Sequence, residues 1–356
     1  NTTADDNTAV GTLALGCNTT GANNTAVGKT ALQANTTGGT NVAVGVNALN
    51  KNTEGDNNVA VGVLALCTNT TGDCNTAIGH CALKVNTTGV QNTALGGFSL
   101  DSNTTGANNV ALGFCTLVAN TTASNNVAIG STTMRANTTG CLNTGVGVGT
   151  LLGNTEGCQN TAIGAVAMED NTTGDNNTAV GFEALCTNTT ATKNTAVGAF
   201  ALNKNTTGAN NTAMGCGALR TNTTASNNTG FGRNALADNT TGSENAALGL
   251  CALAGNTEGT SNTAVGANAL KVSTTGVQNV SIGMGSMLGG TTGSYNTALG
   301  ACTLQAVNTG ANNVAIGRKA LFDNTSGNNT VAIGNDALTN QTTGANNTSV
   351  GASSAL

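Results

Sequence analysis

The chain has 356 residues, of which 8% are charged and 2% are aromatic, with 50 glycines and neither proline nor tryptophan. Its formal net charge of −5 offers no basic stripe for nucleic acid, and no apolar run approaches the roughly 18 residues of a membrane span. The composition therefore argues against nucleic-acid binding and membrane insertion. It also excludes a conventional core of large side chains, so small residues must pack at short range.

The sequence is a tandem repeat of 17 residues. An apolar residue followed by Gly recurs at this spacing from Val10-Gly11 to Val350-Gly351, in 21 copies without insertion or deletion. Such a period is typical of repeat proteins, in which each unit contacts mainly its neighbours. We number the positions of the repeat from Asn7, which is position 1. The period predicts one continuous domain over residues 1–356, either a segment of a longer array or the subunit of a filament.

The repeat opens with Asn-Thr-Ala-Val, which predicts a short strand because β-branched residues alternate with a small one. The apolar residues of position 4, such as Val10, Val27 and Val44, are predicted to face inward, as are Met214 and Phe231. Position 3 is nearly always Ala. This column forms either a flat face on which copies of the chain pack closely or the filling of a narrow corner within one coil.

Asn occupies position 1 in 20 of the 21 repeats, and Thr330 is the exception. Identical residues of stacked coils lie above one another, so we predict a ladder of side-chain amide hydrogen bonds along the axis. The first members of this ladder are Asn7, Asn24, Asn41 and Asn58.

Gly occupies position 5 in all 21 repeats, which indicates a corner where φ is positive or where two backbones approach closely. The first of these corner glycines are Gly11, Gly28, Gly45 and Gly62. Ala-Leu at positions 8 and 9 predicts a second inward contact, and Asn-Thr-Thr-Gly at positions 12 to 15 predicts a return turn with Asx and left-handed preferences. Helical repeats need about 33 residues or more. We therefore predict an all-β parallel β-solenoid, or β-roll, of about 21 coils with 17 residues per coil.

The repeat resembles those of two families. Asn-Thr-Ala-Val-Gly resembles the Asn-Ser-Val-Ala-Ile-Gly coils of trimeric autotransporter adhesin heads, although the unit here is longer. The full repeat is more similar to the Asn-Thr-Ala-Ile-Gly…Ala-Leu…Asn-Thr-Thr-Gly arrays in the shafts of phage and viral tail-fibre-like proteins. The resemblance covers essentially the whole chain. It implies a left-handed β-roll, commonly a homotrimer, displayed outside a cell as a surface appendage or on a virion as a fibre.

The 11 cysteines include no CxxC pair of metal-site spacing. Cys141 and Cys158 both occupy position 16 of consecutive coils, where stacked Cα atoms about 4.8 Å apart fall within the disulfide range. The sequence thus predicts a candidate disulfide between them.

Asn-Thr-Thr is also an N-glycosylation sequon in a eukaryotic secretory pathway. Candidate glycosylation sites are Asn18, Asn35, Asn69, Asn86 and Asn103. The alternative is that the motif serves turn geometry alone, which Asn52-Thr53-Glu54 supports because it keeps the turn and loses the sequon.

No catalytic constellation recurs in the sequence. The single histidine, His80, lies at a variable surface position, and Gly145-Val146-Gly147 lacks the strand-loop-helix context of a nucleotide site. We expect no enzyme activity, no cofactor and no metal.

Two function classes stay open. The first is a structural extracellular fibre, filament or adhesin shaft that gives reach, stiffness and multivalent display. Its partners would be copies of itself, as a homotrimer, a head-to-tail filament or both, and a cell-surface or glycan receptor. The second is a flat Thr-rich face that binds a ligand, with ice as the leading candidate, because Thr recurs at position 2. Val42 and Val59 interrupt this rank, and position 2 shares parity with the apolar residue predicted to face inward.

Overall fold

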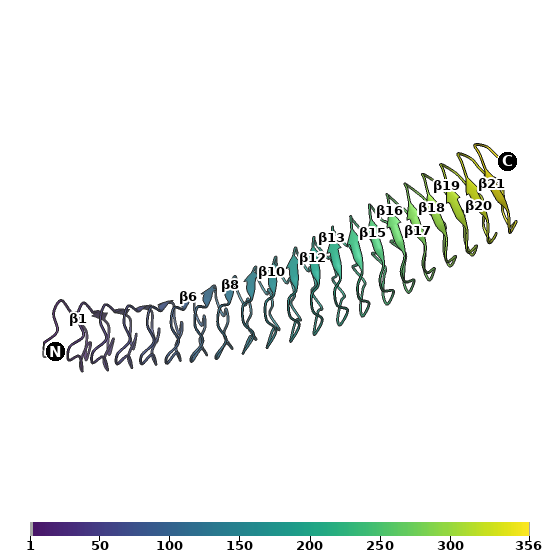
Figure 1. The fold of residues 1–356 in the computed structure, drawn as a ribbon. Helices are drawn as coiled ribbons and strands as arrows, with labels where there is room; N and C mark the ends of the chain where they lie inside the picture. Colours follow the sequence, from purple (N-terminus) through teal and green to yellow (C-terminus); the bar gives the residue numbers. More distant parts are fainter. Residues whose placement is uncertain (1–2, 356) are drawn as a thin grey trace. The chain divides into compact units, whose positions relative to one another are not determined.

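The computed structural model describes residues 3–355 and shows an all-β chain with one three-residue strand in each repeat (Figure 1). The predicted parallel β-solenoid with 17 residues per coil is confirmed. The chain divides into two units, of which the first ends at Asn177 and the second begins at Thr178. Each coil carries the number of its strand below.

The strands of the first unit are β1 (Thr8–Val10), β2 (Thr25–Val27), β3 (Val42–Val44), β4 (Val59–Val61), β5 (Thr76–Ile78), β6 (Thr93–Leu95), β7 (Val110–Leu112), β8 (Val127–Ile129), β9 (Thr144–Val146) and β10 (Thr161–Ile163). Those of the second unit are β11 (Thr178–Val180), β12 (Thr195–Val197), β13 (Thr212–Met214), β14 (Thr229–Phe231), β15 (Ala246–Leu248), β16 (Thr263–Val265), β17 (Val280–Ile282), β18 (Thr297–Leu299), β19 (Val314–Ile316), β20 (Val331–Ile333) and β21 (Thr348–Val350).

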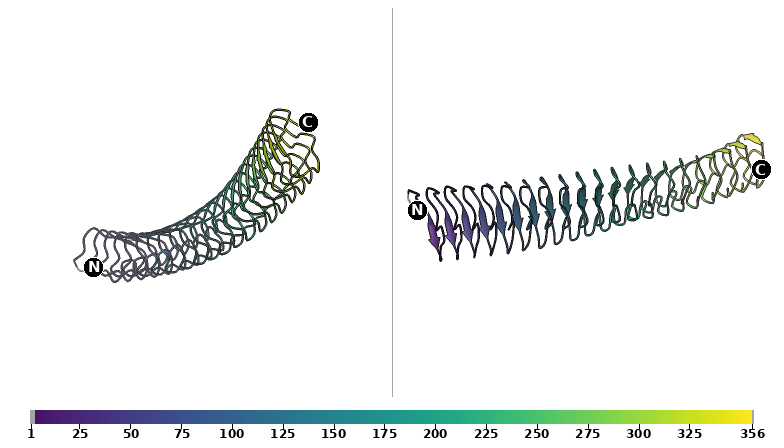
Figure 2. Two further views of the ribbon diagram at one scale, coloured as in Figure 1. Left: turned by 45° about the vertical axis from the view of Figure 1, so that its right-hand side comes forward. Right: turned by 90° about the horizontal axis from the view of Figure 1, so that it is seen from below.

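Within each unit, every strand pairs in parallel with the next strand along the chain, so the coils follow one another as a stack (Figure 2). The register joins equivalent residues, for example Thr8 with Thr25 and Ala9 with Ala26. Each position of the repeat therefore becomes a column of like residues.

Backbone hydrogen bonds join neighbouring coils far beyond the strands. The N–H of Leu32 at position 9 donates to the carbonyl of Ala48 at 3.0 Å, and the N–H of Thr36 at position 13 donates to that of Thr53 at 2.9 Å. Since turns and strands alike donate to a neighbouring coil, short strands suffice to hold a regular stack.

The core of each coil is thin and made mainly of small residues. Ala26, Ala31 and Leu32, at positions 3, 8 and 9, have no exposed surface. In one coil a larger core residue is met by a smaller residue beside it. Next to Met134, position 3 of the following coil is Gly145, where an added Cβ would lie only 3.0 Å from the Met134 Cε.

The prediction that position 4 faces inward is wrong. All residues of position 4 are half-buried or exposed, with 58% of Val10, 36% of Met214 and 46% of Phe231 accessible. Successive side chains of a strand point to opposite faces, and the narrow interior accepts only the small residue of position 3. Ala at position 3 therefore fills its own coil, which was one of its two predicted roles.

The backbone of the corner at position 5 needs glycine for two reasons. Gly28 has φ of +136°, and a Cβ there would lie 2.5 Å from the carbonyl oxygen of Gly45 in the next coil. The other predicted corner glycines, Gly11, Gly45 and Gly62, have φ between +133° and +140°.

Left-handed residues also occur where no glycine marks them. The return turn places its left-handed residue at position 17, as in Asn23 with φ of 59°, and not within Asn-Thr-Thr-Gly as predicted. Leu32 at position 9 has φ of 49°. The left-handed conformation costs about 1–2 kcal/mol, whereas full burial of a Leu side chain stabilises by about 1.5–3 kcal/mol, so burial decides the backbone here.

Candidate functional site

The outward residues of the strands form a surface that repeats with every coil of each unit. We call positions 2 and 4 together the strand face. Position 4 is apolar in all 21 repeats, while position 2 is Thr in 13 repeats and Val in seven. Neither position carries a charge in any repeat. Exposed apolar surface that is contiguous beyond a few hundred Å² marks interaction sites on soluble proteins.

The regularity of the strand face follows from the strand register. Leu95, Leu112 and Ile129 belong to three adjacent paired strands and occupy the same register position. Neighbouring strands lie about 4.8 Å apart, so like side chains recur at this interval along the stack. The face thus offers two parallel rows, one of Thr or Val and one of larger apolar residues.

Two buried columns of Asn stand behind this surface. At position 12, the Nδ2 of Asn35 donates to the Oδ1 of Asn18 at 2.7 Å and to the carbonyl of Gly38 at 2.8 Å. At position 1, the Nδ2 of Asn24 donates to the same Gly38 carbonyl at 2.9 Å, and the Oδ1 of Asn24 accepts the N–H of Asn41. Both columns therefore converge on the carbonyl of position 15.

The amide-to-amide ladder predicted for position 1 runs instead along position 12 through most coils, and Ser273, Gly290 and Val307 interrupt it. Among the predicted members, the side chain of Asn7 accepts the N–H of Asn24, and that of Asn41 accepts the N–H of Asn58. Direct amide contacts at position 1 occur in some coils, as between Asn92 and Asn75 at 3.2 Å. The backbone N–H competes for the position 1 oxygen, which the sequence pattern alone does not reveal.

One paired departure from the repeat preserves part of this network. Thr330 replaces Asn at position 1, and in the same coil Gln341 replaces Asn at position 12. The longer Gln341 side chain donates to the carbonyl of Gly344 at 2.7 Å and to the hydroxyl of Thr330 at 3.3 Å. The exception thus keeps the carbonyl of position 15 bonded.

The sequon residues Asn18, Asn35, Asn69, Asn86 and Asn103 all belong to the buried position 12 column and are at most 2% exposed. The Nδ2 of Asn69, for example, donates to the Oδ1 of Asn52 and to the carbonyl of Gly72, both at 2.9 Å. A glycan on this nitrogen would require the side chain to leave the coil. The fold therefore disfavours glycosylation and supports the turn interpretation of the motif.

The structure brings the two predicted disulfide partners together. The Sγ atoms of Cys141 and Cys158 lie 2.9 Å apart, and both residues are half-buried free thiols. The backbone N–H of Cys141 also donates to the Sγ of Cys158 at 2.9 Å. Burial, followed by the hydrogen bond with Cys141, raises the pKa of the Cys158 thiol to about 11.

A small cluster of rings lies at positions 6 and 7, which the repeat pattern leaves variable. The exposed His80 contacts the Phe98 ring edge-to-face with centroids 5.2 Å apart, and Phe98 contacts Phe114 in the same manner at 6.0 Å. The Nε2 of His80 lies 3.4 Å from the Sγ of Cys81. This arrangement joins three coils by side-chain packing.

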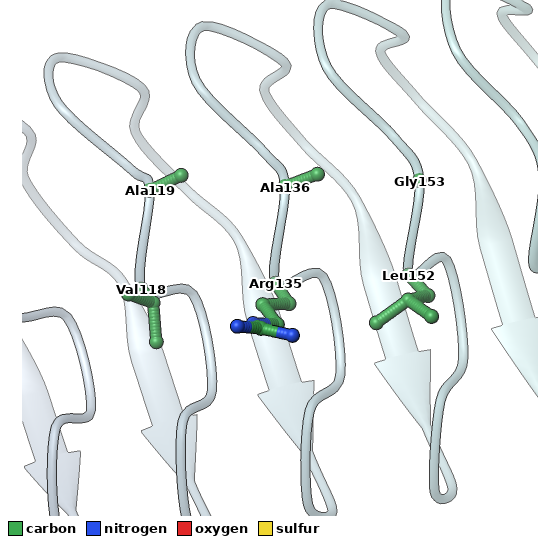
Figure 3. Close-up of a pocket in the computed structure, with 6 residues that line it drawn as sticks. All are labelled: Val118, Ala119, Arg135, Ala136, Leu152 and Gly153. Atoms are coloured by element: carbon green, nitrogen blue, oxygen red, sulfur yellow. The ribbon is translucent and has the colours of Figure 1, made fainter.

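A shallow hollow of about 480 Å³ lies over positions 10 and 11 of coils 7 to 9 (Figure 3). Its lining forms two rows, one of small residues at position 11 and one of larger residues at position 10. The lining residues are Val118, Ala119, Arg135, Ala136, Leu152 and Gly153. One guanidinium beside alkyl groups gives this hollow no nucleophile or acid for catalysis.

Residues 3–355 contain no group of three or more His, Cys, Asp or Glu placed to hold a metal ion. Over the same residues, no helix is long and apolar enough to cross a membrane. Comparison with models of known protein families finds no match, and comparison with curated protein sequences finds none. The assignment of function therefore rests on the geometry of the strand face and of the columns behind it.

Proposed function

We propose that this chain is a structural fibre or adhesin shaft whose copies associate side by side through the strand face. One observation carries the proposal: position 4 is apolar in every repeat, yet every one of these side chains points outward. A core role does not account for this column, since position 3 fills the interior. Contact with another molecule does account for it.

The energy of such a contact grows with the number of coils. Covering a Val or Ile that is about half exposed contributes on the order of 1 kcal/mol per coil before costs. Association itself costs about 4–15 kcal/mol in lost rigid-body freedom. Several coils must therefore join at once, so that a long uniform array associates where a single repeat would not.

A second copy of the same chain is the partner that fits this surface. Its coils have the same axial spacing, so apolar residues of both chains meet in register over many coils. A partner without strands stacked at this spacing of about 4.8 Å would match at a few coils only. The resemblance to trimeric adhesin heads and tail-fibre shafts supports three chains per cross-section and a site outside the cell or on a virion. Longer filaments and a cell-surface or glycan receptor belong to the same proposal.

The buried Asn columns support the shaft role. Each rung joins consecutive coils by side-chain hydrogen bonds in addition to the backbone bonds, as in Asn35 with Asn18 and Asn52 with Asn35. Bending the stack would stretch these bonds on one side of the coil. A stiff spacer that presents the same surface at every level is the expected result.

Ice binding is the second candidate, and a specific observation favours it. Position 2 faces outward together with position 4, which removes the parity objection that the sequence raised. Thr25, Thr76 and Thr93 are half-buried on this face. Val interrupts the row of Thr at position 2 in seven repeats, and the neighbouring row at position 4 is apolar rather than a second row of Thr.

The two candidates use the same surface, so the oligomeric state of the native chain separates them, and one pair of variants tests whether association uses the strand face. We would replace Leu95, Leu112 and Ile129 together with Glu and measure molar mass by light scattering and analytical ultracentrifugation. The matched control replaces Thr105, Thr122 and Thr139 with Glu in the same coils. These residues are exposed at position 14, where Glu54 shows that the repeat accepts Glu.

The shaft proposal predicts that the native chain is oligomeric, that the strand-face variant shifts toward monomer at equal concentration, and that the control does not. Cryo-electron microscopy of the native chain would then show three-fold symmetry in cross-section. A native chain that stays monomeric at all concentrations would refute the lateral association. Thermal hysteresis in that monomer would establish ice binding, and its absence would exclude both candidates.

A further inference from the structure

Position 16 has its own hydrogen-bonding rule, which bears on the cysteine pair. In several coils the N–H of this position donates to an Asp, Ser, Asn or Cys side chain at position 16 of the next coil. Gly39 donates to the Oδ1 of Asp56 at 2.6 Å, and Ala107 donates to the Oγ of Ser124 at 3.0 Å. Side chains in this column therefore fold back toward the preceding coil.

Cys158 follows the same rule. Its Sγ accepts the N–H of Cys141 at 2.9 Å, while its own N–H donates to the Oδ1 of Asp175 at 2.6 Å. The first of these bonds holds the sulfur of Cys158 against coil 8, which places it 2.9 Å from the sulfur of Cys141. The meeting of the two thiols thus follows from the column and does not depend on chance rotamers.

We propose that Cys141 and Cys158 form a redox-controlled disulfide that staples coil 8 to coil 9. The register fixes the pair, because these are the only cysteines that share one position in consecutive repeats. The sulfurs are less than 1 Å beyond the bond length of about 2.05 Å, so closure needs little movement. Both residues are half-buried, so a small oxidant can still reach the sulfur atoms.

The oxidant is a low-molecular-weight disulfide such as oxidised glutathione. One protein thiolate attacks this disulfide and releases one glutathione thiolate, which takes up a proton. The second protein thiolate then attacks the mixed disulfide at the protein sulfur and releases the second glutathione. Two protein thiols lose two protons and two electrons, and the glutathione disulfide gains them.

The groups around the pair set its response to pH. Burial raises the pKa of the Cys158 thiol, and the thiol of Cys141 and the carboxylate of Asp175 add to this effect, so its thiolate is scarce at neutral pH. Because the thiolate is the attacking species, closure becomes faster as the pH rises. The staple then forms slowly and persists until a reductant reaches it.

Peptide mapping of the folded full chain tests the proposal. The protein is incubated with oxidised glutathione, free thiols are blocked, and the chain is cut with trypsin and a Glu-specific protease. Cleavage after Arg135, Glu156 and Glu169 places Cys141 in residues 136–156 and Cys158 in residues 157–169. We expect these two peptides as one disulfide-linked species that separates on reduction, with the protein migrating as a single chain on a non-reducing denaturing gel.

The control is Cys158→Ser, because Ser124 shows that a Ser in this column accepts the same backbone N–H. It should keep the fold and lose the linked species. The proposal is overturned if both cysteines of the native chain are recovered as blocked thiols, if they carry only glutathione, or if the linked peptides come from a dimer on the non-reducing gel. None of these outcomes depends on whether the strand face associates.

Discussion

Replacing Asn103 with Ala probes the buried column at position 12 in the middle of the first unit. The Asn103 side chain donates to the Oδ1 of Asn86 at 2.8 Å and to the carbonyl of Gly106 at 3.0 Å, and it accepts from the Nδ2 of Asn120 at 2.8 Å. Gly106 keeps a second donor, Asn92, at 2.8 Å. The Oδ1 of Asn86 loses the donor that the column provides.

Three neutral hydrogen bonds contribute about 1 kcal/mol each, and an unsatisfied buried oxygen costs about 1–3 kcal/mol, with the two effects overlapping. We expect a local destabilisation of about 3 kcal/mol. Amide hydrogen exchange is the suitable assay, since a repeat array opens locally and has no single unfolding transition. The backbone N–H of Thr104, which bonds to Thr121 in the next coil, should exchange roughly 100-fold faster.

The matched control for this measurement is Thr105→Ala, two residues away on the exposed side of the same turn. It should change exchange at Thr104 by less than about threefold, as surface substitutions usually do. If Asn103→Ala behaved like this control, the Asn column would contribute nothing beyond the backbone bonds. The stiffness attributed to it would then have no basis.

Two further predictions concern the corner glycine and the buried thiol. Gly113→Ala would place a Cβ 2.6 Å from the carbonyl oxygen of Gly130. It should destabilise the stack locally by more than about 3 kcal/mol, which protease cleavage near coil 7 would show. The control is Gly97→Ala, where the nearest atom lies 3.5 Å away on Phe114, and it should resist cleavage like the native chain. For Cys158, a raised pKa means that the neutral thiol persists to higher pH. The alkylation rate of Cys158 should therefore be lower in the folded chain than in the unfolded chain below about pH 11, and the two rates should converge above that pH. Equal rates near neutral pH would contradict the burial effect.

The fold class follows from the sequence because the period alone dictates the register. A 17-residue repeat without insertions stacks each residue on its equivalent, and the contact between Cys141 and Cys158 follows from the same arithmetic. The direction of the strand side chains does not follow. In Thr25-Ala26-Val27 the larger apolar residue is the conventional candidate for the core, and the width of the interior decides otherwise.

One isolated pair in the sequence bears on that width. Met134 and Thr133 in one coil are followed by Gly145 at position 3 of the next, whereas Met168 and Met287 are followed by Ala179 and Ala298. The left-handed Leu at position 9 has no comparable signal. Local preferences argue against φ of 49° at Leu32, and only the contacts of the folded coil reverse them.

The polar interior and the apolar surface of this protein are linked. Asn at positions 1 and 12 holds each coil to the next by hydrogen bonds, so the coil needs only Ala and Leu for its apolar contacts. Position 4 is thereby relieved of any role in the core, and its apolar character in all 21 repeats calls for another cause. The proposed contact with another copy at every coil would supply that cause, because a surface used along the whole chain would keep the same chemistry at each level.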